Sequence, residues 1–323
     1  METVRQNTKG KKASEILFKK ERFGRRLVKD LKRNKYIYIM VLPVVIYYLI
    51  FHYGPMYGVQ IAFKDFSLTE GIWGSEWVGF KHFLDFFKGY YFWRLIRNTF
   101  LINIYELLLA FPAPILLALL LNELRRIWFK RVVQTISYLP HFISVVVVVG
   151  MLVDFTTQNG LINQLLSIFG VEPISFLQKP EWFRTLYIGS GIWQSIGWGS
   201  IIYLAAMSNI NSELYEAAKI DGANRFKQAL HVTIPGIAPI IIILLILQIG
   251  SMMSVGFEKI ILMYNPLTYD TADVISTYVY RKGILEANFS FSAAVGLFNA
   301  IINLTLLVLA NRISAKVSET SLW

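Results

Sequence analysis

The side chains that usually carry catalysis or bind metals are sparse in this sequence. It contains no cysteine, and its histidines stand singly at His52, His82, His141 and His231. Thiolate chemistry and disulfides are therefore excluded, and the histidine spacing does not indicate a metal site. The sequence also lacks a phosphate-binding GxxxxGK[ST] pattern, so it cannot bind ATP by that route. We predict no catalytic residue, no metal site and no cofactor held by this chain.

Polar side chains occur instead inside long apolar runs, where each is costly and therefore a candidate site. The residues concerned are Trp193, Gln194, Trp198, Gln248, Asn299 and Asn303. Sugar rings can stack on indole faces, and amides bind hydroxyls as donors and as acceptors. The set suits a carbohydrate path, although polar side chains also hold membrane helices together. Both interpretations stay open for each residue.

Charged residues near the apolar runs have competing interpretations. Glu106 is the only carboxylate well inside a run. A proton relay would need ionisable partners in the other runs, and none is visible, so a hydrogen-bonded structural role is favoured. Several basic residues lie close to the ends of apolar runs and could steer an acidic ligand or anchor the interface. They are Arg94, Arg97, Arg184, Lys259, Arg281 and Lys282.

The composition is that of an integral membrane protein. Apolar residues make up 55% of the 323 residues and charged residues 16%, against about 25% charge in soluble proteins. The net charge of +11 is concentrated, since 13 of the 32 basic residues precede Tyr36. Such a tail indicates a cytoplasmic membrane anchor rather than a nucleic-acid partner. Leu17, Phe23, Leu27 and Leu31 predict an interfacial helix within it.

Six apolar runs are long enough to span a bilayer. They cover residues 36–53, 98–121, 132–153, 184–208, 236–256 and 291–311, and the fourth is the weakest because of its glycine, serine and glutamine content. With the N-terminus inside, the cytoplasmic segments hold 22 of the 32 basic residues but only 9 of the 21 acidic ones. This asymmetry predicts an all-α membrane protein with both termini cytoplasmic. We expect a tail at 1–35, a membrane domain at 36–311 and a second tail at 312–323.

Two segments outside the spans have distinctive sequence patterns. The outer stretch 61–98 carries many aromatics, which suit either a headgroup-level belt or a docking surface for an external protein. The pattern of the cytoplasmic loop 209–235 predicts two short helices separated by Gly222, which can turn the chain at low steric cost. Pro235 then breaks or starts an element as the chain re-enters the membrane. We expect a finger that another protein grips.

The spacing in this loop resembles the signature of ATP-binding-cassette importer membrane subunits. Glu216-Ala217-Ala218 are followed by three residues and Gly222, and nine more residues lead to Val232-Thr233-Ile234-Pro235. That family's pattern is Glu-Ala-Ala, three residues, Gly, nine residues and Ile-x-Leu-Pro, so the two departures are conservative. Asp221 and Ala223 also match the sugar-importer version. The apolar runs are similar to those of oligosaccharide importer permeases, including importers of acidic oligosaccharides such as alginate.

The resemblance implies a six-helix type I importer permease in a bacterial cytoplasmic membrane. It implies two separate ATPase subunits, which hold ATP and Mg, a second homologous permease, and an extracytoplasmic solute-binding protein. It further implies that Glu216, Ala217, Ala218, Asp221, Gly222 and Pro235 couple the chain to the ATPases, although Glu216 could instead cap or solvate its helix. Transport would proceed by alternating access of a cavity between the two permeases, with an oligosaccharide as cargo and lipid around it.

Two other functions compete with transport by an ATP-driven importer. An ion-coupled carrier would require intramembrane acid or base relays and would not need the cytoplasmic finger. A membrane enzyme would need a cluster of His, Asp, Glu or Ser near one interface, and no such cluster is evident. Within transport, the cargo could be a polyol, a phosphodiester or a peptide instead of a sugar.

Overall fold

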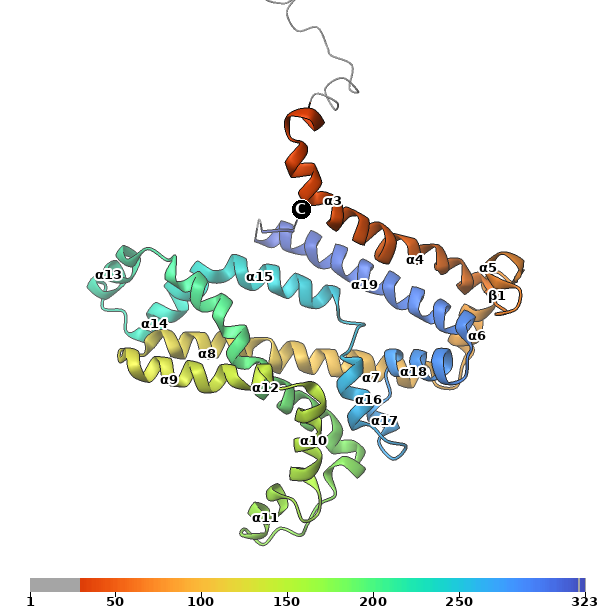
Figure 1. The fold of residues 1–323 in the computed structure, drawn as a ribbon. Helices are drawn as coiled ribbons and strands as arrows, with labels where there is room; N and C mark the ends of the chain where they lie inside the picture. Colours follow the sequence, from red (N-terminus) through yellow and green to blue (C-terminus); the bar gives the residue numbers. More distant parts are fainter. Residues whose placement is uncertain (1–29, 319, 323) are drawn as a thin grey trace, which may run out of the picture. The chain divides into compact units, whose positions relative to one another are not determined.

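The computed structural model describes residues 30–318 and 320–322. The described part is helical except for one small two-stranded sheet (Figure 1). The chain divides into two units, Met1–Val59 and Gln60–Trp323, and each is considered by itself. Residues 1–29, with most of the predicted interfacial helix, lie outside the described part.

The first predicted span is helical over a longer stretch than expected. Its segments are α3 (Lys35–Tyr48), the π-helix η1 (Leu49–Tyr53), α4 (Gly54–Met56) and the 3-10 helix η2 (Tyr57–Phe63). Together they make a helical run, Lys35–Phe63, that is long and apolar enough to cross a membrane. Pro43 lies inside α3.

The aromatic outer stretch folds into a hairpin and a short amphipathic helix. Strand β1 (Lys64–Asp65) pairs antiparallel with β2 (Glu76–Trp77), α5 (Gly71–Gly74) lies between them, and α6 (Lys81–Lys88) follows. Phe83 and Phe86 of α6 are buried, and Phe86 packs in a cluster with Leu95 and Val295. These two phenylalanines belong to the core, whereas most of the other aromatic side chains of the stretch stay exposed. Trp77 and Tyr90 are exposed.

The second predicted span is a helix with a wider turn in its middle. It consists of α7 (Phe92–Tyr105), the π-helix η3 (Glu106–Ala110) and α8 (Pro112–Glu123). Pro112 has no backbone N–H to donate, and Phe111 N instead donates to Glu106 O at 2.9 Å. The π-turn accommodates the proline without ending the helix. Glu106 is the first residue of this π-turn.

The third predicted span, 132–153, is not a single helix. It is divided among α9 (Ile127–Tyr138), the 3-10 helix η4 (Leu139–Phe142) and α10 (Val145–Thr156). Pro140 lies in η4, and a new helix begins after Ser144, whose side chain accepts from Val147 N. The five consecutive valines of α10 favour a strand by propensity. A helix forms because a chain in lipid must satisfy its backbone groups within the segment.

The fourth predicted span lies within one continuous helix, α12 (Pro180–Ser208). The loop before it contains α11 (Leu161–Ser167) and the 3-10 helix η5 (Phe176–Gln178). Glycines let α12 approach its neighbours closely, because a Cβ at Gly197 would lie 2.0 Å from Ser137 O and one at Gly199 would lie 3.0 Å from Pro114. Small residues at helix contacts are typical of membrane bundles.

The remaining chain contributes two long helices and an outer segment of short ones. After α13 (Ser212–Ile220), a helical run comprises α14 (Arg225–Gln228), the π-helix η6 (Ala229–Thr233) and α15 (Ile234–Gly250). The outer segment holds α16 (Phe257–Met263), α17 (Tyr269–Ala272), α18 (Ile275–Tyr280) and the π-helix η7 (Arg281–Leu285). The final helix, α19 (Phe289–Val317), lies beside α15 (Figure 1).

Five helical runs in the described chain are long and apolar enough to cross a membrane. They are Lys35–Phe63, Phe92–Glu123, Val145–Ser167, Arg225–Gly250 and Phe289–Val317. They correspond to five of the predicted spans, with the third beginning later than predicted. The predicted fourth span has the length in α12 but is not among the five. Its glycines, serines and glutamine lower its apolar character, so a count of six spans stays a prediction.

Candidate functional site

The loop predicted to be gripped is a helical hairpin. Asn211 caps α13 by accepting a hydrogen bond from Glu213 N at 3.0 Å, and Asn224 caps α14 by accepting from Lys227 N at 2.9 Å. Gly222 lies between the helices with a φ of +74°, where an L side chain is strained. Ala223 N closes the end of α13 by donating to Ala218 O at 2.8 Å. The predicted turn at Gly222 is confirmed.

Side-chain contacts hold the two arms of the hairpin together. The hydroxyls of Tyr215 and Thr233 lie 2.9 Å apart, and Gln228 Nε2 donates to Ala223 O at 2.8 Å. Arg225 pairs with Glu123 at the end of α8, which fastens the hairpin to the neighbouring loop. The hairpin is therefore a braced element rather than a flexible linker.

The signature residues lie mainly on the hairpin surface. Glu216, Ala217, Asp221 and Gly222 are exposed, and Ala218 is half-buried. Apolar side chains are exposed beside them, most strongly Ile220 at 86% and Phe226 at 75%. Exposed apolar side chains grouped on one element are characteristic of a docking surface.

Pro235 does not break the chain into two elements, contrary to one of the expected alternatives. The helix runs continuously over Arg225–Gly250. The π-turn η6 ends immediately before Ile234, and Pro235 follows in the first turn of α15. The arrangement matches that before Pro112, where a π-turn also accommodates a proline. The hairpin is thus joined to the span as one rod.

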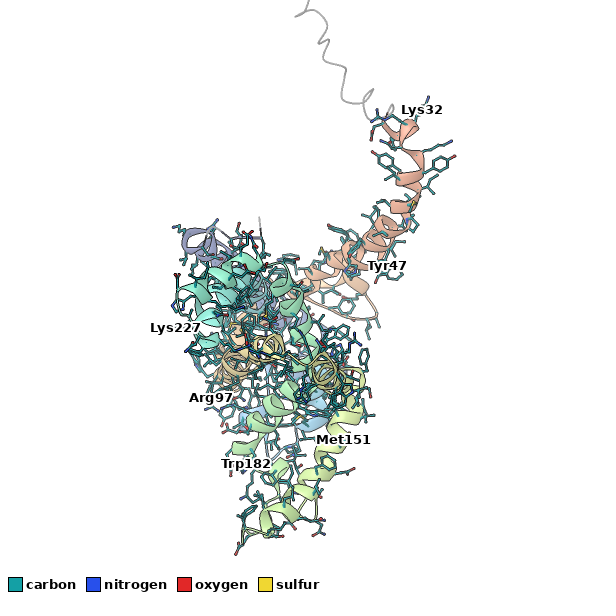
Figure 2. The ribbon with its side chains drawn as sticks, turned by 90° about the vertical axis from the view of Figure 1, so that its left-hand side faces the viewer. Lys32, Tyr47, Arg97, Met151, Trp182 and Lys227 are labelled. Carbon is teal, nitrogen blue, oxygen red and sulfur yellow. The ribbon has the colours of Figure 1, made fainter. Side chains whose placement is uncertain are left out.

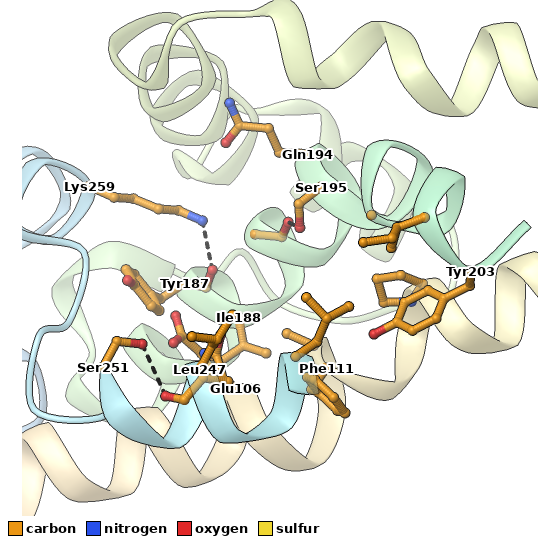
Figure 3. Close-up of a pocket in the computed structure, with 17 residues that line it drawn as sticks. Glu106, Phe111, Tyr187, Ile188, Gln194, Ser195, Tyr203, Leu247, Ser251 and Lys259 are labelled. Carbon is orange, nitrogen blue, oxygen red and sulfur yellow. Dashed lines mark hydrogen bonds between the residues drawn. The ribbon is translucent and has the colours of Figure 1, made fainter. Parts of the chain in front are cut away.

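A cavity of about 670 Å³ lies among three of the long helical runs and the outer segment (Figure 3). Its lining comes from η3, α8, α12, α15 and α16. The polar residues that line it are Glu106, Tyr187, Gln194, Ser195, Tyr203, Gln248, Ser251 and Lys259. A volume of this size is within the range of ligand pockets. Its mixture of amides, hydroxyls and aromatic rings is suited to a polyhydroxylated ligand.

Only two of the six predicted path residues line this cavity, namely Gln194 and Gln248. Gln194 also donates to Ile143 O at 2.9 Å, which satisfies a carbonyl at the break between η4 and α10. Trp193 lines a separate pocket between α10 and α12. Trp198 stacks on His141 with ring centres 4.5 Å apart. The two tryptophans therefore lie outside the cavity lining.

The two asparagines of α19 have different surroundings. Asn303 accepts from Met253 N at 2.8 Å and donates to Ser254 Oγ at 2.9 Å, so it holds the chain that leaves α15. Asn299 lines a smaller pocket with α18 and η7, and its buried Oδ1 has no hydrogen-bond partner among the described residues. The structure supports a structural role for Asn303 and does not bring the pair to the main cavity.

Two charged residues with competing interpretations, Glu106 and Lys259, both line the cavity. Lys259 Nζ donates to Tyr187 O at 2.8 Å (Figure 3). The Tyr187 hydroxyl hydrogen-bonds the Glu106 carboxyl group. Burial lowers the pKa of Lys259 to about 8, and the charge of Glu106 partly opposes that shift. Glu106 had been noted as the one carboxylate inside a run. Its neighbours could not be foreseen because they come from α12 and from the outer segment.

A second charged cluster lies on the outer segment. Asp273 is fully buried and pairs with Arg94 at 3.2 Å and Arg281 at 2.6 Å. Burial, the largest single effect, lowers the pKa of Arg281, but hydrogen bonds to Asp273 and Tyr264 together with the charges of these two groups outweigh burial, and the pKa is raised. Asn98 Nδ2 donates to the carbonyls of Asp270 and Asp273. The cluster fastens the outer segment to α7. Arg97 of α7, one of the predicted steering residues (labelled in Figure 2), also pairs with Asp270.

The family of this chain is decided by comparison with known proteins. Residues 110–319 match the family described as binding-protein-dependent transport system inner membrane component. The chain belongs to this family. The predicted family is thereby confirmed, and the protein is a multi-pass membrane component of a transport system. Its family is one of transport components rather than catalysts.

Relatives and solved structures agree with that family. The chain is 48% identical over 309 residues to the polygalacturonan/rhamnogalacturonan transport system permease protein YteP of Bacillus subtilis (strain 168), covering 95% of this chain and 96% of that protein. It is similar to a chain in the crystal structure of a bacterial alginate transporter in complex with an alginate pentasaccharide-bound periplasmic protein. That similarity has a TM-score of 0.86 and 45% identity, over 92% of this chain and 100% of the other. A second alginate-importer structure gives a TM-score of 0.85 with 46% identity.

Proposed function

We propose that this chain is a permease subunit of an ATP-driven, binding-protein-dependent oligosaccharide importer in a bacterial cytoplasmic membrane. The observation that carries the proposal is the braced hairpin, on which Glu216 and Ala217 are exposed and which is joined as a continuous rod to a span that lines a sugar-sized cavity. A rod transmits displacement at one end to the other, as energy coupling requires. The cargo is an acidic oligosaccharide, in keeping with the pectin-type and alginate systems that the chain resembles.

The working assembly contains four subunits and a delivery protein. Two ATPase subunits bind ATP and Mg and receive the hairpin, with Ile220 and Phe226 supplying apolar contact area and Glu216 and Asp221 polar contacts. A second homologous permease completes the pore, and a solute-binding protein presents the oligosaccharide from outside. Closing of the ATPases moves the hairpins and alternates access to the cavity. Gln194 and Gln248 contact the cargo from this chain.

The coupling role is tested by substitution at the turn. Gly222→Asp places a side chain in the strained positive-φ region and adds a charge to the docking face. We expect binding-protein-dependent uptake into proteoliposomes to fall at least about tenfold, which corresponds to a loss of about 1.4 kcal/mol in coupling. Insertion and basal ATP hydrolysis should persist. The measurement is uptake per ATP hydrolysed with the full complex.

Gly170 supplies a matched control for that experiment. Its φ is +76°, and the space around its Cβ position is open, as it is at Gly222. Gly170→Asp therefore introduces the same backbone strain and the same charge on the outer loop after α11. If both variants reduce uptake equally, strain and not docking explains the loss, and the coupling role is contradicted. Uptake that persists with inactivated ATPases would favour an ion-coupled carrier.

A further inference from the structure

The amine of Lys259 lies at the cavity and has N–H donors without an acceptor among the described residues. The residue is only 9% exposed, and Nζ lies 4.8 Å from the centre of the Tyr187 ring. An ammonium group has three N–H donors. Among the described residues, one acceptor is found for them, the carbonyl of Tyr187 at 2.8 Å. Two donors are therefore left at the edge of a cavity that is large enough for a sugar.

Glu106 is a nearby counter-charge that does not occupy those donors. It lines the same cavity and is held by the Tyr187 hydroxyl. Within the described residues it forms no direct ion pair with Lys259, although the two charges attract one another. Buried charges are normally paired directly, because an uncompensated one is costly. Lys259 is thus compensated at a distance and remains able to bind an anion directly.

The surroundings of the amine keep it available to a ligand. Gly191 of α12 lies beside it, and a Cβ there would be 3.4 Å from Nζ, so the absence of a side chain leaves the approach from the cavity open. Gln194 and Ser195 follow on the same helix and line the cavity too. Figure 3 shows both among the residues that line the cavity, with the Lys259 amine directed at the Tyr187 carbonyl. A carboxylate on the amine would place its sugar hydroxyls near amide and hydroxyl groups.

We propose that Lys259 binds the carboxylate of an acidic sugar unit in this cavity, and that Glu106 is the counter-charge with which that carboxylate competes. The inference rests on the proposed function, because it requires the cavity to lie on the substrate path. It assigns selectivity for acidic over neutral sugars to one residue of the permease, separately from any selection by the binding protein. At neutral pH most of the amine is protonated, as this role demands.

The test uses a thiol reporter in the purified complex of this chain with its partner permease and ATPases. The chain contains no cysteine, so Ser195→Cys introduces a single thiol in the cavity lining. In detergent both faces of the complex are open to reagent. The rate of alkylation of this chain, followed by mass spectrometry, is measured against increasing concentrations of an oligouronate and of the same oligosaccharide with its carboxyl groups reduced to alcohols. The half-protecting concentration of each sugar is the readout.

Lys259→Gln in the Ser195→Cys background should weaken protection by the oligouronate and leave the reduced sugar unaffected. The half-protecting concentration of the oligouronate should rise about tenfold, as expected for loss of one hydrogen bond between charged groups. That of the reduced sugar should change less than about twofold. Glu106→Gln should act in the opposite direction and strengthen protection by the oligouronate, because a competing carboxylate is removed. Lys282→Gln is the matched control, since Lys282 pairs with Glu286 at 2.6 Å on the same outer segment.

The outcomes separate this inference from the proposed function. Equal losses of protection for the two sugars in Lys259→Gln would show that Lys259 only holds α16 against α12, and would overturn the inference. Unchanged protection by the oligouronate would overturn it as well. If neither sugar protects the thiol in the complex with Lys259 intact, the cavity is not on the substrate path, and the proposed function fails with it. Protection lost for the oligouronate alone supports the proposal.

Discussion

Single residues of this chain carry charge in places where burial inside the protein makes charge expensive. Asp273 has no exposed surface, yet two arginines and Thr277 satisfy its carboxylate. Removing one member of such a group leaves the others buried without a partner, which costs more than the contact itself contributes. The cluster is therefore a point of high sensitivity in the outer segment.

Asp273→Asn should destabilise the protein strongly, because Arg94 and Arg281 would lose their shared anion while remaining largely buried. The expected cost is about 3–5 kcal/mol, seen as a clear fall in the melting temperature of the detergent-solubilised complex. Asp270→Asn is the control, since its pair with Arg97 is exposed and should contribute at most about 1 kcal/mol. Equal shifts for the two variants would contradict the assigned role of Asp273.

Helices in this chain are shaped by prolines and glycines rather than ended by them. Pro112 and Pro235 each follow a π-turn, so the helix widens by one residue and continues. In η3 this widening coincides with the position of Glu106, which lines the cavity. Glycines in α12 act differently, since they remove side chains where α8 and α9 approach.

The contact between α12 and α9 can be tested by adding one methyl group. Gly197→Ala would place its Cβ 2.0 Å from the backbone oxygen of Ser137, so the helices would have to separate. We expect a destabilisation of about 1–3 kcal/mol, the usual cost of overpacking, measured as a lower melting temperature. Gly189→Ala on the same helix has open space at its Cβ. It should be neutral or slightly stabilising, since alanine is the better helix former. A harmless Gly197→Ala would exclude this close approach.

At the scale of the whole molecule, the direction of the chain through the membrane determines what each site can do. The hairpin at Gly222 reaches an ATPase only if it faces the cytoplasm, and the loop that contains α11 must then face outward. The charge asymmetry of the loops predicts this arrangement. It depends on α12 crossing the membrane even though its composition is less apolar than that of the five other runs.

Single cysteines in this cysteine-free chain test the direction of the chain. Ser212 and Ser167 are both exposed, one at the start of α13 and the other at the end of α11. An impermeant thiol reagent applied to whole cells should label Ser167→Cys, and should label Ser212→Cys only after the membrane is opened. Both variants replace an exposed serine by cysteine, so each is the control for the reactivity of the thiol in the other. Labelling of both from outside would require an even number of crossings between them and would rule out the proposed coupling.

Particular elements show why part of the fold was predictable. The runs in α7–α8, α15 and α19 were found because apolar length alone decides whether a segment can enter a bilayer. The turn at Gly222 was found because a positive φ favours glycine so strongly. The break at η4 was missed. Pro140 and the hydrophobic residues around it satisfied the length rule, and only the donation from Gln194 to Ile143 O reveals that a neighbouring helix supports an interrupted backbone there.

The sequence by itself determined that this is a membrane protein, where most of its spans lie, and that its loop resembles the signature of importer permeases. These properties depend on composition and local spacing, which are complete within short stretches of chain. Only the tertiary structure decided that Glu106 and Lys259 share a cavity while Trp193, Trp198 and Asn303 do not line it. Residues 153 positions apart meet there through the packing of η3, α12 and α16. Contacts of that kind depend on helix rotation and close approach, and no local pattern in the chain records them.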